Sequence, residues 1–441
     1  MSAILELPII NSPAMWIIYA VAIALTVTLL GRRNSKSKRG TTKKWLPRAL
    51  IGIVVGAVVG FLIYLGGNAL DLFGVDLPGP VGGWAAAMFA GVGLAIVSFP
   101  DAKPWRKVVA SLSILAYLVA GATGINAFYG LNPTLGSVFG IVEEDQITLP
   151  DFNADNRQAP AQPLAATWQA PADMPSVGQR GSVPIPGTTS GFVARDAGIY
   201  LPPAALVENA PALPVVIMMM GYVGNPDPTI ISDVLDQFAA DHNGLAPIVI
   251  VADQLGGAGD VDPACADSAK YGNAETYVTT DVVNWVNANL NVIQDPKYWT
   301  VAGYSNGGRC AAKYAAKDPG TFKNIISVSG EPFPGSEGQD AVTADIYGGD
   351  ANAFEASKPV TIMQAAPAGT YAGMTAIFTA GSEDPAFVSA ATTVSQATEA
   401  LGIATTLFIV QGADHGGDAV SGGLTEGFNV LYPVLGLSSG S

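Results

Sequence analysis

A five-residue segment beyond residue 300 constrains the fold of this chain more than any other feature. Gly303-Tyr304-Ser305-Asn306-Gly307 follows a β-branched and aromatic run at 298–302 and precedes a helix-like run at 309–317. A side chain two residues before or after the serine would clash in a sharp turn from strand to helix, and glycine stands at both places. The pattern therefore predicts a strand, a serine at strained backbone angles, and a helix whose N-terminus faces the serine hydroxyl.

A serine in this setting is typical of the nucleophile elbow of α/β-hydrolases. Amide groups and the helix dipole at the helix N-terminus favour the negative charge that develops when the serine attacks a carbonyl. Ser305 is thus the candidate nucleophile, and a glycine-rich turn with a capping serine is the alternative. For the oxyanion hole we expect the backbone amides of Asn306 and of Tyr222, which follows the strand-like run at 215–220.

A serine nucleophile needs a base, and the chain has two histidines. His415 lies just past the strand-like run at 405–410 and precedes Gly416 and Gly417. His242 closes a helix-like stretch, where it would interact with the last carbonyl groups, and it lies before the serine in the chain. Because α/β-hydrolases run in the order serine, acid, histidine, His415 is the predicted general base. The alternative is a histidine on a surface loop.

The acid should lie between them, after the strand-like run at 374–380. Asp384, in the turn that follows, is the predicted acid, and its neighbour Glu383 is the alternative. Its role would be to hold the imidazole in one tautomer and to stabilise the imidazolium. Asp414 suits this role less, because a residue next to His415 rarely curls back to Nδ1. Two solvated carboxylates in a turn would be the non-catalytic interpretation.

Four further polar residues stand near the elbow or at predicted strand ends. They are Arg309, Glu331, Asp253 and Gln254. Each is a candidate for contact with substrate, and the alternative is that they pair with each other or with solvent.

Two segments, 275–285 and 301–308, resemble the esterase D family. That family includes S-formylglutathione hydrolases, feruloyl and enterochelin esterases, and secreted mycolyltransferases. The resemblance covers roughly 180–435, and it implies an α/β-hydrolase fold and ester chemistry without a cofactor or metal. Mycolyltransferases tend to carry tryptophans soon after the catalytic histidine. Here the residues at 416–419 are Gly-Gly-Asp-Ala, so a trehalose-mycolate specificity is not supported at this point.

Four apolar stretches, at about 13–30, 46–67, 82–100 and 107–127, precede this region. Each is close to the ~20 residues that cross a bilayer as a helix. No charged residue lies in the middle of a stretch, which argues against a transporter.

The basic residues between these stretches predict the orientation. Those between the first and second are Arg32, Arg33, Lys36, Lys38, Arg39, Lys43, Lys44 and Arg48, and those between the third and fourth are Lys103, Arg106 and Lys107. The loop between the second and third holds Asp71 and Asp76 and no basic residue. Basic loops stay in the cytoplasm, so the N-terminus and everything after residue 127 are expected outside.

Glycines at four-residue spacing mark the second stretch: Gly52, Gly56 and Gly60. Such spacing lets another backbone approach closely. We interpret it as packing within the four helices, and a site for a second membrane protein is the alternative.

Composition separates the chain into three predicted parts. Residues 1–127 are a four-span transmembrane region, and 128–180 are a Pro- and Ala-rich linker or lead-in, part of which could pack on the next domain. Residues 181–441 are one α/β domain with a mostly parallel sheet and helices on both faces. Beyond residue 110 there are 10 basic and 32 acidic residues, a net charge of −22, which excludes nucleic-acid binding.

Both cysteines, Cys265 and Cys310, lie in this last domain. In an oxidising compartment a single pair is more often bonded than free, so we predict a disulfide, with two separate buried thiols as the alternative. With so few sulfur and imidazole ligands, a zinc site is not expected.

These features predict a serine esterase anchored on the outer face of a bacterial cytoplasmic membrane, acting on ester-linked acyl groups of envelope lipids or glycolipids. Transfer of the acyl group to a sugar hydroxyl is the enzymatic alternative. A catalytically idle hydrolase domain in an envelope-assembly complex is the alternative of another class.

Overall fold

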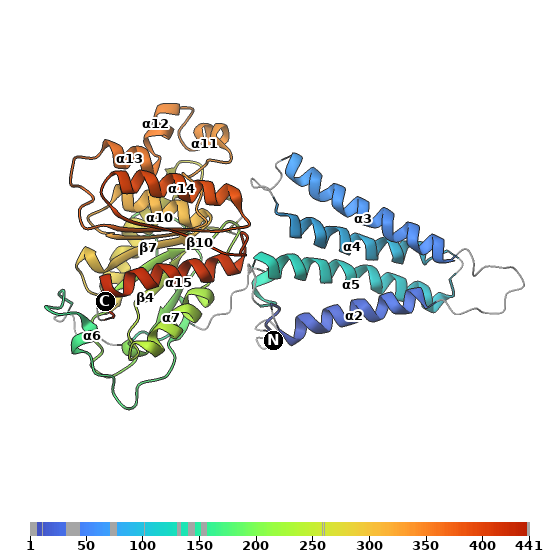
Figure 1. Ribbon diagram of the computed structural model, residues 1–441, viewed down its shortest axis with the longest axis horizontal. Helices are drawn as coiled ribbons and strands as arrows, with labels where there is room; N and C mark the ends of the chain where they lie inside the picture. The colour runs from blue at the N-terminus through green and yellow to red at the C-terminus, as the bar shows by residue number, and fades with distance from the viewer. Residues whose placement is uncertain are drawn as a thin grey trace, which may run out of the picture. The chain divides into compact units, whose positions relative to one another are not determined.

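The computed structural model describes residues 7–10, 12–31, 45–70, 77–100, 102–129, 134–139, 146–150, 157–257, 259 and 261–438. The chain divides into two compact units, Met1–Glu143 and Glu144–Ser441. Figure 1 shows the elements of both units.

The first unit consists of four long helices. They are α2 (Pro13–Leu30), α3 (Trp45–Ala69), α4 (Gly79–Val97) and α5 (Pro104–Tyr129), and a 3₁₀ turn, η2 (Ser137–Phe139), follows them. All four helices are long and apolar enough to cross a membrane, as predicted. The chain is therefore a multi-pass membrane protein. The basic residues at 32–44 and the acidic Asp71 and Asp76, on which the orientation largely depends, lie outside the described residues.

The glycine face of α3 packs against α4. A Cβ on Gly56 would lie 2.0 Å from the carbonyl oxygen of Phe89, and a Cβ on Gly60 would lie 2.3 Å from that of Ala85. Gly52 meets α4 in the same way, one turn earlier. The glycine face of α3 is thus covered by α4, as expected if the glycines serve packing among the four helices.

The second unit contains an eight-stranded sheet in the order β1-β2-β4-β3-β7-β8-β9-β10. Its strands are β1 (Gln179–Val183), β2 (Ala197–Leu201), β3 (Val215–Met219), β4 (Ile248–Ala252), β7 (Trp299–Tyr304), β8 (Asn324–Val328), β9 (Thr375–Gly381) and β10 (Ala404–Val410). From β4 to β10 every neighbouring pair is parallel, and β1 and β2 add an antiparallel edge. The central strands are short apolar runs buried along their whole length, as a sheet covered on both faces requires.

Helices cover both faces of this sheet. On one face α10 (Asn306–Lys317) packs against β3, β7 and β8, beside α13 (Pro359–Ala365) and α14 (Pro385–Ala400). On the other face α15 (Gly417–Val434) packs beside α7 (Thr229–Asp241) (Figure 1). This is the predicted α/β-hydrolase architecture.

The remaining elements belong to loops of the second unit. They are α6 (Leu164–Thr167), η4 (Pro203–Ala205), β5 (Asp267–Ser268), β6 (Gly272–Asn273), α8 (Ala274–Thr276), the π-helix η5 (Tyr277–Val282), α9 (Val283–Asn289), η6 (Pro296–Tyr298), α11 (Gln339–Asp345) and α12 (Ala351–Ala356).

The described part of the segment before β1 packs on the second unit. Leu164 is buried in the core, and the indole nitrogen of Trp168 donates to the carbonyl of Asn243 at 2.9 Å. The amide of Ala165 donates to Gly436 at 3.0 Å, near the end of the chain. The sequence left open whether part of 128–180 packs on the α/β domain. These contacts show that residues 164–168 do.

Candidate active site

Ser305 occupies the turn between β7 and α10. Its backbone lies at φ 53° and ψ −117°, in the left-handed region that side chains disfavour. A Cβ on Gly303 would lie 2.1 Å from the carbonyl oxygen of Gly307, and one on Gly307 would lie 2.1 Å from that of Met219. The predicted strand, strained serine and helix are therefore present, and the two glycines are needed because backbone fills the space around them.

Ser305, His415 and Asp384 meet at the carboxyl ends of three parallel strands. The Oγ of Ser305 lies 2.9 Å from Nε2 of His415, and Nδ1 of His415 lies 2.8 Å from Oδ2 of Asp384. Asp384 stands at the residue just before α14, shortly after β9, and His415 lies in the turn between β10 and α15. Glu383 and Asp414, the neighbours weighed against Asp384, do not take this position. The side chains of His415 and Asp384 are 16% and 15% exposed, so solvent and a substrate can reach them.

Two aromatic rings hold the imidazole in place. The ring of Phe387 lies 4.0 Å from that of His415, centroid to centroid, and the ring of Tyr304 lies at 5.3 Å. The hydroxyl of Tyr304 also donates to the carbonyl oxygen of His415. Sequence reasoning missed both residues. Phe387 could have been found, because it stands one helical turn after Asp384.

Gln254 joins the two segments that carry the expected oxyanion donors. Its amide nitrogen donates to the carbonyl of Met220 at 2.6 Å and to the side-chain oxygen of Asn306 at 3.1 Å. A Cβ on Gly221 would lie 3.4 Å from the Cβ of Ser305, so the loop after β3 runs directly past the serine. Tyr222 follows on this loop and is 42% exposed. Both amide hydrogens of Gln254 are engaged here.

Asp253 is held by an arginine that sequence reasoning did not single out. Its buried carboxylate accepts hydrogen bonds from the backbone amide, Nε and Nη2 of Arg195, at 2.7, 3.1 and 2.7 Å. Arg195 also donates to the side chain of Asn225 at 2.8 Å and to the carbonyl of Gly224 at 3.1 Å. The pair thus fixes the loop after β3 to the end of β4.

Arg309 lies one turn after Ser305 and is 1% exposed. Its guanidinium pairs with Asp262, with Glu337 and, at 3.4 Å, with Glu331. The structure therefore shows the pairing that was the alternative to substrate contact for Arg309 and Glu331. Because these carboxylates come from two loops, one after β4 and one after β8, Arg309 holds both loops against the start of α10.

Glu331 is the unusual member of this cluster. Burial raises the pKa of Glu331 from its ordinary value of 4.5 to about 7, because the stabilising charge of Arg309 is offset by burial and by the neighbouring Glu337. Among the described residues its Oε2 has no hydrogen-bond partner. Glu331 thus changes charge near neutral pH, beside the helix that carries the serine.

We expect Glu331→Gln to remove a pH dependence of stability. A carboxyl whose pKa is raised by folding stabilises the fold fully below pH 4.5, and this contribution is lost as the pH rises to about 7. The difference in free energy of unfolding between variant and wild type should therefore shift in favour of the variant by about 2–3 kcal/mol from low pH to above pH 7. Melting curves of both proteins from pH 5 to 8 measure this. A difference that stays constant across this range would show that Glu331 does not titrate there.

Cys265 and Cys310 form a disulfide bond, as predicted, with their Cα atoms 5.2 Å apart. Lys313, one turn further along α10, donates to the carbonyl oxygen of Cys265 at 2.8 Å and pairs with Glu275 at 3.0 Å. The loop after β4 is therefore tied to α10 at three positions within about one turn: Arg309, Cys310 and Lys313. Within the described ranges, His, Cys, Asp and Glu side chains form no group of three that could hold a metal ion.

Comparisons with known proteins identify the family. The family model described as "Putative esterase" matches residues 194–408. An uncharacterized protein of Corynebacterium glutamicum is 31% identical over 421 residues, which is 92% of each chain. The chain carries a domain of this putative esterase family. The matched range of the esterase domain contains Ser305 and Asp384 and ends before His415.

Three solved structures of hydrolases are similar to part of this chain. A ferulic acid esterase has a TM-score of 0.48 at 16% identity, covering 59% of this chain and 99% of its own. An S-formylglutathione hydrolase from Agrobacterium tumefaciens has a TM-score of 0.47 at 17% identity, with 60% and 98% covered. The Staphylococcus aureus serine hydrolase FphF, which binds fluorophosphonates, has a TM-score of 0.46 at 14% identity, with 58% and 98% covered.

Proposed function

We propose that the esterase domain hydrolyses carboxylic esters through an acyl-enzyme formed on Ser305. The observation that carries the proposal is the continuous hydrogen-bonded chain from Ser305 through His415 to Asp384. This chain combines a hydroxyl at a helix N-terminus, an imidazole in reach of its proton, and a carboxylate that orients the imidazole.

The reaction follows from this geometry. The Oγ of Ser305 attacks the ester carbonyl while its proton passes to Nε2 of His415. The amides of Asn306 and Tyr222 stabilise the oxyanion, and the imidazolium returns its proton to the leaving alcohol as the carbon–oxygen bond breaks. Water then attacks the acyl-serine with His415 again as base, which releases the acid and restores Ser305. A sugar hydroxyl in place of this water would give the acyltransferase alternative.

Exposed apolar side chains on the loops after β3 and β4, and on the segment before β2, support an acyl chain as the substrate group. Val193, Tyr222, Val223 and Val261 are exposed at 78%, 42%, 52% and 39%. The amide of Gly257 donates to the carbonyl of Val193 at 3.1 Å, which links it to the loop after β4 that also carries Val261. Exposed apolar groups near a reactive serine favour binding of an apolar substrate. For a membrane-embedded esterase, lipids or glycolipids with ester-linked acyl groups are the nearest such substrates.

Replacing two of these valines should change the preference for chain length. Val193→Ser and Val223→Ser are each expected to lower kcat/KM for p-nitrophenyl decanoate about five- to tenfold, and to leave p-nitrophenyl acetate nearly unchanged. Val177→Ser is the matched control. Val177 is 57% exposed and precedes β1, where Gln179 pairs with Leu201, at the end of the strands away from the carboxyl ends that hold Ser305. Equal losses for both esters would show that these loops do not contact the acyl chain.

We further propose that the esterase domain is extracytoplasmic. The side chain of Arg106, at the start of α5, donates to the carbonyl of Gly31 at the end of α2 at 3.1 Å. The C-terminal end of α2 and the N-terminal end of α5 therefore lie at the same end of the membrane unit. Both are next to basic residues in the sequence, so this end is the cytoplasmic one under the positive-inside rule. The C-terminal end of α5, from which the chain continues to the esterase domain, is then outside.

A membrane-impermeant fluorophosphonate tests the nucleophile and the orientation together. Applied to intact cells, it should modify the wild-type protein and leave Ser305→Ala unlabelled. Labelling that requires cell lysis would place the domain in the cytoplasm and overturn the orientation. A wild-type protein that stays unlabelled in cells and in lysate would support the non-catalytic alternative.

A further inference from the structure

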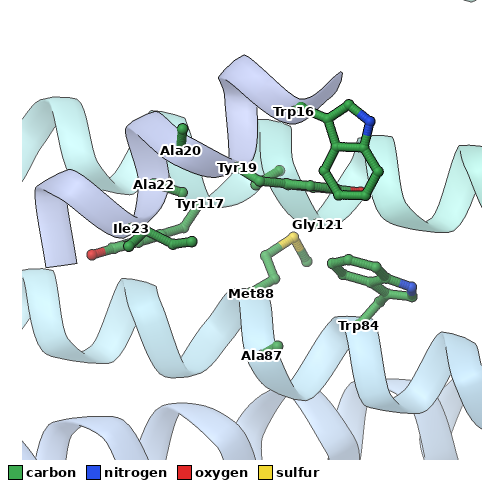
Figure 2. Close-up of a pocket in the computed structure, with 11 residues that line it drawn as sticks. Trp16, Tyr19, Ala20, Ala22, Ile23, Trp84, Ala87, Met88, Tyr117 and Gly121 are labelled. Atoms are coloured by element: carbon green, nitrogen blue, oxygen red, sulfur yellow. The ribbon is translucent and has the colours of Figure 1, made fainter. Parts of the chain in front are cut away.

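The membrane unit contains a groove between α2, α4 and α5 that the side chains of these helices do not fill. α2 and α4 both pack along α5 and contact each other at few positions, and between the three helices lies a cavity of about 510 Å³. Its lining is aromatic and aliphatic, with alanines and a glycine between the larger side chains (Figure 2).

The aromatic rings that line the groove pack against glycines of neighbouring helices. The rings of Tyr19 and Trp84 stack with centroids 5.7 Å apart and planes 20° from parallel. A Cβ on Gly124 would lie 2.5 Å from the ring of Trp84, and a Cβ on Gly91 would lie 2.5 Å from the ring of Tyr117. Any larger residue at these glycines would displace a ring. The sequence thus places small residues where the walls of the groove need room.

The two ends of the groove differ in chemistry. Figure 2 shows Trp16 and Trp84 at one end, and Ile23 and Tyr117 at the other. At the second end the hydroxyls of Tyr117 and Thr26 are 2.7 Å apart and hydrogen-bonded, so these polar groups are satisfied and the space takes an apolar group. At the first end two indole N–H groups are donors near the ends of α2 and α4, where Trp commonly sits at the membrane interface.

The size of the groove decides between a lipid chain and a further helix. A helix with its side chains is 10–12 Å wide, so one turn fills roughly 400–600 Å³. The cavity therefore takes about one turn, whereas a helix that crosses the bilayer has five or more and would remain largely outside. A single alkyl chain from the surrounding bilayer fits a narrow groove of this kind along its length.

We propose that this groove binds one acyl chain of a membrane lipid. The ester end of the lipid lies at the end of the groove lined by Trp16 and Trp84, where the indoles donate to its oxygens, and the chain runs toward Tyr117. Trp84 packs on Gly124, close to the C-terminal end of α5, and the described residues beyond α5 include no further candidate span. The lipid is therefore held in the leaflet from which the chain continues to the esterase domain. Its use as a substrate rests on the proposed function, but its binding does not.

Photo-crosslinking tests the proposal with the full-length protein in nanodiscs. The probe is phosphatidylglycerol with a diazirine at the middle of one acyl chain, and peptide mass spectrometry locates the labelled residues. We expect labelling to concentrate on the groove, at Ile23, Met88 and Tyr117. Ile23→Trp should fill the groove from α2 and lower labelling of α4 and α5 about tenfold, and Ala87→Leu should lower it from the α4 side.

The control is Ile17→Trp, on the same helix. Ile17 and Ile23 are 62% and 64% exposed, but only Ile23 lines the groove. Labelling in Ile17→Trp should match that of the wild type. Labelling spread evenly over the outward faces of the helices would overturn the proposal, and so would labelling that Ile23→Trp leaves unchanged. Ser305→Ala should keep the full groove labelling, so failure of the esterase mechanism remains distinguishable from failure of lipid binding.

Discussion

Ser305→Ala is expected to lower kcat for a short p-nitrophenyl ester by roughly 10⁴–10⁶-fold while the protein keeps its melting temperature. His415→Ala should lose about as much, because the two residues act in one proton transfer across 2.9 Å. The double variant should therefore be no worse than either single variant. Residual activity in Ser305→Ala close to that of the wild type, or losses that multiply in the double variant, would contradict a shared mechanism.

The neighbouring carboxylates Asp384 and Glu383 provide a matched pair for the acid. Asp384→Asn should lower kcat by about 10⁴-fold, since the amide would favour the wrong tautomer of His415. Glu383→Gln should stay near the wild type, because Asp384 is the carboxylate that lies 2.8 Å from Nδ1 of His415. A larger loss in Glu383→Gln would move the acid to that residue.

Removal of the disulfide is expected to have the largest effect on stability. The bond between Cys265 and Cys310 closes a loop of 45 residues, and its loss should reduce the free energy of unfolding by about 3–4 kcal/mol. For a domain of this size that corresponds to a fall in Tm of about 5–10 °C. Because both cysteines are buried, the Cys265→Ser/Cys310→Ser variant is a cleaner test than added reductant. Thermal unfolding of this variant in detergent, followed by intrinsic fluorescence, measures the change.

The same variant tests whether the bond also positions the active site. Cys310 lies in the helix that begins beside Ser305, and Cys265 lies in the loop that this helix holds. We therefore expect kcat/KM for the short ester to fall together with Tm, even well below the melting range. A lower Tm with unchanged kcat/KM would limit the bond to stability. Free thiols in the native protein would show that the bond does not form.

Much of the architecture could be predicted because it depends on local physics. The length and apolarity of the four N-terminal stretches suffice to identify helices that cross a membrane. Alternation of short apolar runs with helical ones suffices to predict a parallel sheet with helices on both faces. A chain with two cysteines offers one intramolecular pairing. These inferences need no knowledge of which distant segments meet.

The partners of individual charged residues could not be predicted in the same way. Arg309 pairs with Asp262 and Glu337, which are 47 and 28 residues away in the chain. Asp253 is held by Arg195, 58 residues before it, so a residue that looked available for substrate is part of a loop anchor. No periodicity in the sequence reports such pairs, because each depends on how two loops approach one helix or strand end.

The sequence by itself determined the nucleophile elbow, since the steric conflict around Ser305 arises within a few residues and only glycine at 303 and 307 relieves it. Tertiary structure alone decided that Asp384 rather than its neighbour Glu383 meets His415, because adjacent side chains point in different directions from a turn. It also decided that aromatic residues of α2 and α4 line one groove along α5. Short-range steric conflicts depend only on neighbouring residues in the chain, whereas contacts between distant segments exist only once the elements have packed.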